Sequence, residues 1–238
     1  MNGPDLQKKH ARYIAQTQWT ESLRKVLYSK LPRINSLSIL EVGSGTGAVL
    51  RCIQTEIPER IRILIGIDID PVSVSFSSRN NSAENIIADG RFLPFADESF
   101  DFVYCHYSLL WCGSPKTIIT EMRRVTASKG ICAALAEPCY SEMDASPESL
   151  YRAGCSQREM LKRKGADADI GNRLGCLFYN AGFTRFEFEK YGKTKMTDEY
   201  LRGEILQLSE DIGADPSVIC PGVKSYYYVP AYYAFAVK

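Results

Sequence analysis

The sequence predicts an α/β fold in which helices cover a mostly parallel β-sheet, within one domain that spans residues 1–238. From residue 38 onward, short runs rich in β-branched residues alternate with stretches of helical period, which is the pattern of βαβ units. A chain of 238 residues is long enough to bury a full hydrophobic core without disulfides or metals. Since no internal repeat or low-complexity linker divides the sequence, one domain is favoured over two.

Five strands are expected in the first 140 residues, with helices between them. The strands are predicted at 38–42, 61–68, 85–88, 100–106 and 131–137. An amphipathic helix follows the first strand and stops before a proline. Asp70 and Ser114, each followed by a proline, are helix-start signals, because the first residue caps the helix and proline suits its first turn. The helix that follows Ser114 is expected to end at Gly130.

The rest of the chain is less regular. Residues 6–31, before the first strand, are expected to form a helix or a pair of helices. After the fifth strand we expect an irregular or partly helical insertion at 140–168, a helix at 170–181, a strand at 183–188 and a helix at 198–212. The aromatic segment 225–238 is predicted to be a strand pair or a bulged edge strand, because Pro230 cannot donate to a β-ladder.

Composition argues against several classes of function. With 29 Lys and Arg against 28 Asp and Glu, no global field attracts the chain to nucleic acid or to an acidic membrane. The longest apolar run is too short to cross a bilayer as a helix, and the polar N-terminal dozen residues do not read as a secretory signal. The eight cysteines never fall as C-x-x-C, so they are expected to be reduced. We therefore expect a cytoplasmic protein without a metal, a nucleic-acid partner or a membrane insertion.

Ligand-binding residues are expected beyond the carboxyl ends of the strands, where open parallel sheets bind their ligands. The first strand runs into a glycine-rich loop, whose backbone can approach a ligand at the N-terminus of the next helix. The loop carries Glu41, Gly43, Ser44, Gly45 and Gly47. Its glycines also satisfy the loose dinucleotide pattern G-x-G-x-x-G/A. Glu41, however, would repel a pyrophosphate and suits a ligand that carries an ammonium group.

Two further acids end the next two strands. Asp68 lies 21 residues after Gly47, about where an acidic residue binds the ribose hydroxyls of an adenosine. Asp70 competes for this role but is better explained as a helix cap. Asp89 ends the third strand, where a carboxylate can accept a hydrogen bond from the adenine amine. An ammonium, two ribose hydroxyls and an adenine amine describe an adenosine with an amino acid attached.

With these residues in place, the sequence resembles the class I S-adenosylmethionine-dependent methyltransferases, in the small-molecule branch that includes enzymes of ubiquinone and menaquinone biosynthesis. The resemblance covers residues 38–137 closely, through ILEVGSGTG, IGIDIDP, IADGRFLPFADESFDFVY and EMRRVTASKG, and is looser for LGCLFYNAGFTRFEFE. It implies a Rossmann-like, doubly wound sheet of seven strands with an antiparallel last strand. It also implies the cofactor S-adenosyl-L-methionine and the product S-adenosyl-L-homocysteine.

The resemblance carries site roles onto matching positions. Glu41 and the loop backbone hold the methionine moiety, Asp68 the ribose, and Asp89 the adenine. The other residues expected at the cofactor are Ile69, Gly90, Arg91, Cys105 and His106. The sequence departs from its relatives after the fourth strand, where CHYSLLW places His106 nearest the methyl group. The usual Lys-Pro-Gly-Gly turn is replaced by the residues at 127–130, interpreted as a tolerated turn variant.

Methyl transfer from a sulfonium is an in-line displacement that depends on alignment and on exclusion of water, so a catalytic base is not obligatory. His106 is the leading candidate for such a base, and the favoured alternative is that it only lines the pocket. The residues expected at the acceptor are Tyr13, Trp19, Tyr107, Trp111, Glu137 and Tyr140. For Tyr13 and Trp19, packing against the sheet is an equal alternative. Segments 1–35, 140–168 and 192–225 are expected to form a lid that chooses the acceptor.

The sequence thus predicts an enzyme that methylates a small, apolar or aromatic metabolite. A nicotinamide-dependent dehydrogenase is disfavoured by Glu41 and by the LPF segment with its following FD-x-V. A binding protein or subunit that holds S-adenosylmethionine without transferring its methyl group stays open. Methylation of protein or RNA is a further alternative, through the basic N-terminal segment, but the absence of an Asn-Pro-Pro-Tyr-type motif argues against an enzyme for exocyclic amines of nucleic acids.

Overall fold

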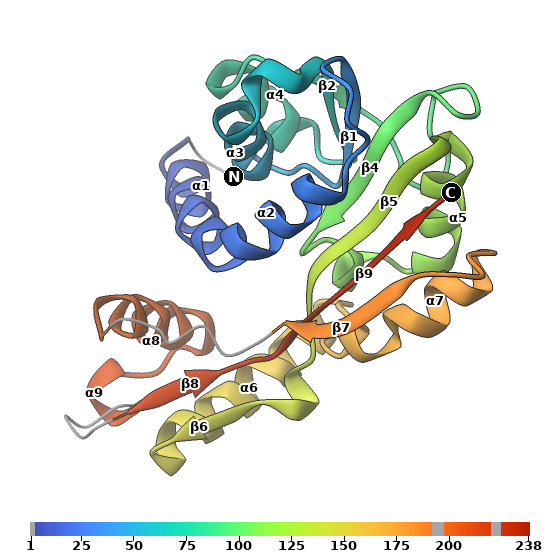
Figure 1. Ribbon diagram of the computed structural model, residues 1–238. Helices are drawn as coiled ribbons and strands as arrows, with labels where there is room; N and C mark the ends of the chain where they lie inside the picture. Colours follow the sequence, from blue (N-terminus) through green and yellow to red (C-terminus); the bar gives the residue numbers. More distant parts are fainter. Residues whose placement is uncertain (1–2, 192–197, 220–224) are drawn as a thin grey trace.

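The computed structural model describes residues 3–191, 198–219 and 225–238, and a twisted seven-stranded sheet organises it (Figure 1). In spatial order the strands are β3 (Glu84–Ile87), β2 (Ile61–Asp68), β1 (Leu37–Val42), β4 (Phe100–His106), β5 (Thr126–Pro138), β9 (Ala231–Val237) and β7 (Glu187–Tyr191). The first five strands are parallel, and β9 runs antiparallel to both of its neighbours. The predicted mostly parallel sheet with an antiparallel last strand is confirmed.

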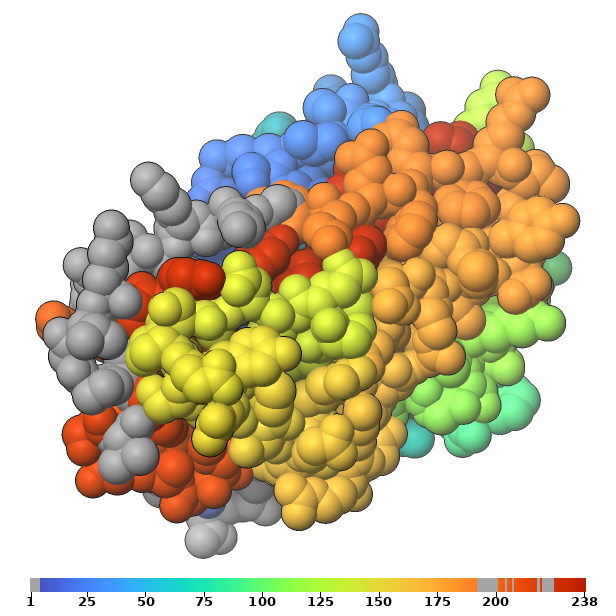
Figure 2. Space-filling model, turned by 90° about the horizontal axis from the view of Figure 1, so that it is seen from below, coloured from blue at the N-terminus to red at the C-terminus, as the bar shows by residue number. Residues whose placement is uncertain are grey.

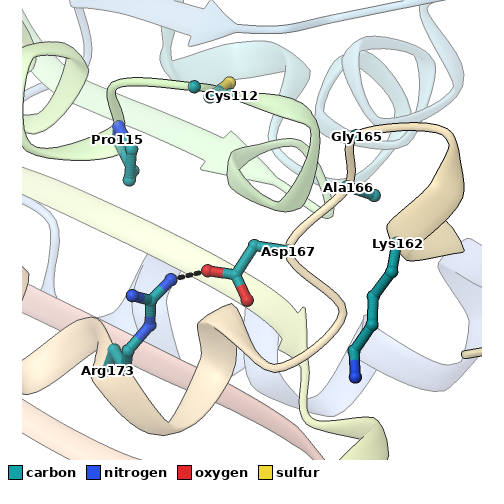
Figure 3. Close-up of a pocket in the computed structure, with 8 residues that line it drawn as sticks. Cys112, Pro115, Lys162, Gly165, Ala166, Asp167 and Arg173 are labelled. Carbon is teal, nitrogen blue, oxygen red and sulfur yellow. Dashed lines mark ion pairs between the residues drawn. The ribbon is translucent and has the colours of Figure 1, made fainter. Parts of the chain in front are cut away.

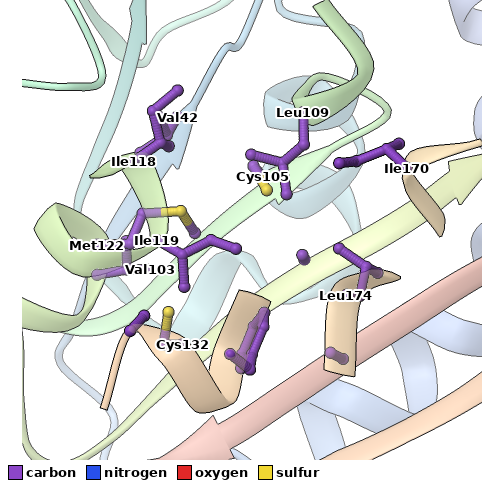
Figure 4. Packing of buried hydrophobic residues seen from close by; sticks show 14 of the residues in the cluster. Val42, Val103, Cys105, Leu109, Ile118, Ile119, Met122, Cys132, Ile170 and Leu174 are labelled. Atoms are coloured by element: carbon purple, nitrogen blue, oxygen red, sulfur yellow. The ribbon is translucent and has the colours of Figure 1, made fainter. Parts of the chain in front are cut away.

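Helices cover both faces of this sheet, and others lie beyond the carboxyl ends of its strands. They are α1 (Gly3–Thr17), α2 (Glu21–Lys30), α3 (Ala48–Glu56), α4 (Pro71–Asn80), α5 (Pro115–Val125), α6 (Glu148–Arg163), α7 (Leu174–Asn180), α8 (Asp198–Ile212) and α9 (Pro216–Ile219). Because successive side chains of a strand point to opposite faces, β1 sends Ile39 into a core with α2 and α3, and Leu40 into a core with α5 and α7. Figure 4 shows part of the second core. β1 is buried along its whole length, as expected for a central parallel strand.

A smaller lobe lies beyond the carboxyl ends of the strands. It consists of α6, α8, α9 and a two-stranded sheet of β6 (Asp144–Ser146) and β8 (Tyr226–Tyr228). The lobe has an apolar core of its own, in which Leu150 of α6 packs with Leu208 of α8 and Tyr227 of β8. In Figure 2 the yellow surface of β6 and α6 adjoins the red-orange surface of residues 198–219.

Most predicted elements form within a few residues of their expected bounds, and Asp70 caps α4 as predicted, accepting from the amides of Val72 and Ser73. The strand expected at 183–188 forms later, at β7. Within the insertion predicted at 140–168, α6 forms a full 16-residue helix.

Two other expectations were wrong. The terminal segment is not an edge, because β9 lies between β5 and β7 and pairs with both. Pro230 instead separates β9 from β8, which belongs to the smaller lobe. In addition, α5 ends at Val125 rather than at Gly130, and residues 127–130 extend β5 instead of forming a turn.

Part of the predicted lid segment 192–225, namely 192–197 and 220–224, lies outside the described residues. Within the described part of the chain, no helix is both long and apolar enough to cross a membrane.

We predict that Gly66→Ala destabilises the protein by about 1–3 kcal/mol, because an added methyl group overpacks the contact between β2 and the glycine loop. A Cβ atom there would lie 2.5 Å from Leu50 Cδ1 and 2.9 Å from Ser44 Cβ. Urea unfolding measures the loss. Gly203→Ala is the control, since a Cβ on this α8 residue meets nothing within 4 Å and should stabilise the helix by about 0.5–1 kcal/mol. Equal effects of the two substitutions would contradict the packing argument.

Candidate active site

A cavity of about 1390 Å³ opens where β1, β2, β3 and β4 end, between the sheet and the smaller lobe. Its wall contains most of the residues that the sequence singled out. They are Tyr13, Trp19, Glu41, Gly43, Ser44, Gly45, Asp68, Ile69, Asp89, Gly90, Arg91, His106, Tyr107, Trp111 and Tyr140. The topology therefore brings together residues from six separate stretches of the chain.

The glycine loop follows β1 with three glycines in the left-handed region, which disfavours residues with a side chain. At Gly43 (φ 76°) a Cβ atom would lie 2.7 Å from Ser108 Cβ, so the loop after β4 can pack tightly against it. At Gly45 (φ 51°) the nearest such contacts are 3.9 and 4.0 Å away, from Tyr13 and from Asp68 Oδ2. The backbone at Gly45 is thus open to a ligand.

Asp68 connects two of the loops that form the cavity. Its Oδ2 accepts from the amide of Gly45 at 2.8 Å, and its Oδ1 accepts from the amide of Asp70 at 2.9 Å. Each carboxylate oxygen has a second lone pair, so Asp68 can still accept from hydroxyl groups of a ligand. Asp70 is occupied by its cap of α4, which leaves Asp68 as the acid expected to bind a ribose.

Asp89 and Arg91 form a bidentate ion pair at the end of β3, with 2.6 Å between Arg91 Nη2 and Asp89 Oδ2. The side-chain and backbone hydrogen bonds from Arg91 lower the pKa of Asp89, so this carboxylate is ionised at neutral pH. Ile69, two-thirds exposed, lies at the end of the neighbouring strand. This part of the cavity offers a carboxylate and an apolar surface, as a purine with an exocyclic amine requires.

Glu41 is almost completely buried beneath the glycine loop, and its Oε2 accepts from the Tyr104 hydroxyl at 2.9 Å. Burial raises the pKa of Glu41 to about 8, against the opposing effect of the Tyr104 hydrogen bond. The neighbouring Ser44 hydroxyl is also buried, and it has no hydrogen-bond partner among the described residues. The Ser44 side chain lies over Gly66, while its backbone donates to the carbonyl of Ile67 and accepts from the amide of Gly47.

Three predicted site residues lie outside the cavity wall. Cys105 is fully buried in the core with α5 (Figure 4), because its side chain points to that face of β4. Gly47 directly precedes α3 and faces α4. A Cβ atom on Gly47 would lie 2.2 Å from Ser77 Oγ. Glu137 was expected at the acceptor, but it is fully buried and acts on the backbone instead.

Glu137 organises the loop after β4. One carboxylate oxygen accepts from the amides of Ser108 and Leu109, both at 2.9 Å, and the other accepts from the amide of Leu110 at 3.2 Å. Ala136 adopts a φ of 57° at an irregularity in the pairing of β5 with β9, next to Glu137. Burial raises the pKa of Glu137 to about 7, although the three amide bonds oppose this shift. The loop thereby presents Tyr107, itself at a φ of 52°, to the cavity.

His106 ends β4 and lies in the cavity wall, within hydrogen-bond distance of the N-terminal segment. Its Nε2 is 3.0 Å from the hydroxyl of Thr20, in the 3-10 turn between α1 and α2. Burial, followed by the positive charge of Arg24, lowers the pKa of His106 to about 3. The imidazole is therefore neutral at neutral pH.

Sequence reasoning missed the polar residues that join α1 to the smaller lobe across the cavity. Arg12 pairs with Asp211 of α8 at 3.9 Å, and Gln157 of α6 donates to the same carboxylate at 3.2 Å. The hydroxyl of Tyr227 donates to Gln157 at 3.0 Å. These residues have ordinary spacing along the sequence, so only the fold reveals their proximity.

A second, smaller hollow of about 430 Å³ lies between the segments 112–115 and 162–173 (Figure 3). An ion pair between Arg173 and Asp167 spans it, and Lys162 lies at its side. Cys112 and Gly113 line both hollows. None of the predicted cofactor residues lines this smaller hollow.

Comparison with known proteins agrees with this geometry. Residues 40–134 match a family model described as a methyltransferase domain. That range contains the glycine loop, Asp68, Asp89 and His106. The chain carries a class I S-adenosylmethionine-dependent methyltransferase domain. The predicted family and its cofactor, S-adenosylmethionine, are thereby confirmed.

Individual relatives of this methyltransferase domain are distant. A malonyl-[acyl-carrier protein] O-methyltransferase of Marinomonas sp. (strain MWYL1) is 29% identical over 107 residues, which cover 44% of this chain and 39% of that protein. The arginine-hydroxylase NDUFAF5 of Danio rerio is 27% identical over 155 residues, covering 59% and 44%. A putative sarcosine dimethylglycine methyltransferase from Galdieria sulphuraria has the same fold, with a TM-score of 0.61, 15% identity and coverage of 92% and 85%. The chain spans less than half the length of these two curated relatives.

The cavity of the methyltransferase domain fits S-adenosylmethionine. Its wall holds the carboxylates of Glu41, Asp68 and Asp89 next to open backbone at Gly45, and these would suit an ammonium group, ribose hydroxyls and an adenine amine in turn. The three acids end β1, β2 and β3, which lie side by side in this order. The ammonium group, the ribose and the adenine follow one another in the same order along the ligand.

We predict that Glu137→Gln destabilises the protein by about 1–3 kcal/mol, because an amide offers one acceptor oxygen where the carboxylate offers two, and a buried backbone amide loses its partner. Urea unfolding of the purified variant measures the change. Glu142→Gln is a matched control at a more exposed carboxylate between β5 and β6, where water can replace the lost bonds. A Glu137 variant as stable as the control would show that the loop does not depend on these bonds.

Proposed function

We propose that this chain transfers a methyl group from S-adenosylmethionine to a small, apolar or aromatic acceptor. The observation that carries the proposal is one continuous cavity, which joins three acids suited to the cofactor to a wall of aromatic side chains. Bound S-adenosylmethionine supplies a methyl group on a sulfonium, already activated for displacement. The protein then has to align the acceptor and exclude water, which can supply on the order of 7–11 kcal/mol.

The acceptor occupies the end of the cavity near the smaller lobe. Tyr107, Trp111 and Tyr140 come from the loops after β4 and β5, and Trp19 comes from the N-terminal segment. Flat aromatic side chains suit an apolar or aromatic acceptor, which they can contact over a large area. The names of the relatives include a methyltransferase for an acyl-carrier protein and one for sarcosine and dimethylglycine, so related domains serve chemically different acceptors.

The lid consists of α1, α6 and the described part of 192–225, mainly α8. All three contribute to the cavity wall, and the contacts of Asp211 with Arg12 and Gln157 join them across it. Since these elements surround the acceptor end, they exclude water and select the acceptor. Domain 1–238 thus has a cofactor half at 38–137 and lid and acceptor-site segments at 1–35, 140–168 and 192–225.

A second candidate is a protein that binds S-adenosylmethionine without transferring its methyl group. The name of the Danio rerio relative, an arginine-hydroxylase, favours keeping this candidate, because it shows the domain in a protein named for another reaction. Incubation with S-adenosylmethionine and pools of small metabolites, with detection of S-adenosylhomocysteine, separates the two. Turnover with a metabolite supports methyl transfer, whereas tight cofactor binding without turnover on small molecules, proteins or RNA supports the second candidate.

We predict that Asp68→Asn weakens binding of S-adenosylhomocysteine tenfold or more, or about 1.4 kcal/mol, because a charged acceptor for the ribose hydroxyls is lost. Isothermal titration calorimetry measures the affinity. Asp70→Asn is the matched control, since asparagine caps a helix as well as aspartate does. Unchanged affinity in the Asp68 variant would remove the ribose assignment.

The pKa of Glu41 makes cofactor binding depend on pH. With a pKa of about 8 in the free protein, Glu41 is mostly protonated at pH 6–7, but its carboxylate form is the one that attracts an ammonium group. Binding therefore strengthens as the pH rises towards 8, by up to about tenfold per pH unit, until the ammonium group of the ligand itself loses its proton. Titrations of wild type and Glu41→Gln from pH 6 to 9 measure this difference. Parallel profiles of the two proteins would contradict it.

A further inference from the structure

The N-terminal segment reaches the reacting end of the cavity through a chain of buried polar groups. Arg24 of α2, only 2% exposed, forms a bidentate ion pair with Glu56 at the end of α3, at 3.0 and 2.6 Å. Its Nη1 donates to the carbonyl of Thr17 at 2.7 Å and to the hydroxyl of Thr20 at 2.9 Å. The Thr20 hydroxyl in turn lies 3.0 Å from His106 Nε2.

The hydrogen atoms of this chain can be assigned. An arginine only donates, so the Thr20 oxygen accepts from Arg24 and has one hydrogen left to give. The candidate acceptors are His106 Nε2 at 3.0 Å and the carbonyl of Thr17 at 3.2 Å. Of these two, His106 Nε2 is the closer acceptor. The geometry therefore favours donation from Thr20 to Nε2.

The same hydrogen bond assigns the second ring nitrogen. A neutral imidazole carries one hydrogen, and since Nε2 accepts from Thr20, that hydrogen is on Nδ1. A neutral imidazole with Nδ1 protonated and Nε2 accepting from a hydroxyl has no lone pair left for another proton.

We propose that Thr20 is a positioning residue that fixes His106 in its neutral Nδ1–H form, so that the packed N-terminal segment completes the reacting end of the cavity and His106 takes no proton from the acceptor. The inference rests on the proposed function for its link to methyl transfer. The acceptor atom is then one that attacks without giving its proton to His106, such as a thiolate, a carboxylate or an unprotonated amine.

The two histidines of the chain make the proposal testable by NMR. In protein labelled with ¹⁵N-histidine and saturated with S-adenosylhomocysteine, long-range ¹H–¹⁵N spectra distinguish the Nδ1–H from the Nε2–H form of each ring. We expect the Nδ1–H pattern for His106 in wild type. Thr20→Val, which keeps the shape but removes the hydroxyl, should lose this pattern, and Thr20→Ser should retain it.

A matched control comes from the other histidine. His10 Nδ1 lies 2.9 Å from the Thr46 hydroxyl, so Thr46→Val should change the His10 signals and leave those of His106 unchanged. An Nε2–H pattern for His106 in wild type, or an Nδ1–H pattern that survives in Thr20→Val, would overturn the proposal. Failure of the proposed function is separate, since it would appear as absence of S-adenosylhomocysteine binding by wild type in calorimetry.

Discussion

Backbone amides in the loops that follow parallel strands need hydrogen-bond partners. The candidate site depends on how this chain provides them. An unpaired amide away from water costs as much as a lost hydrogen bond, and a loop beyond a strand has no ladder to join. Carboxylates supply the missing acceptors here. Asp68 accepts from the amides of Gly45 and Asp70, and Glu137 accepts from three successive amides after β4. These two side chains hold the loops that surround the cofactor cavity.

The two carboxylates differ in what they have left to offer. Asp68 lines the cavity and keeps lone pairs for a ligand, so the same side chain shapes the loop and faces the cofactor. Glu137 is enclosed by protein, and its oxygens serve only the loop. Tyr107, at a left-handed φ, directly precedes Ser108, whose amide donates to Glu137. The buried carboxylate therefore influences the proposed acceptor end of the cavity through the backbone of this loop. Under the proposed function, recognition of the acceptor would depend on a residue that no substrate touches.

The N-terminal segment belongs to the site as much as the sheet does. Its buried Arg24 is neutralised by Glu56, and removing one partner of such a pair leaves an uncompensated charge in the interior. The segment is also joined to the glycine loop through His10 and Thr46, and to α8 through Arg12 and Asp211. These contacts of α1 are polar, so α1 can separate from them at modest cost when ligands enter or leave, while α2 stays packed in the core.

Sequence alone determined the parts of this protein that depend on local order. The strand and helix pattern, the cap at Asp70 and the cofactor acids at the ends of β1 to β3 could be predicted, because each is written in consecutive residues and their place follows from parallel topology. The tertiary structure decided the rest. The direction of Cys105 into the core, the bulge that points Glu137 to the loop, and the insertion of β9 between β5 and β7 follow from packing between distant segments. So does the meeting of Thr20 with His106, 86 residues apart, which no periodicity encodes because it arises only when α2 packs on α3.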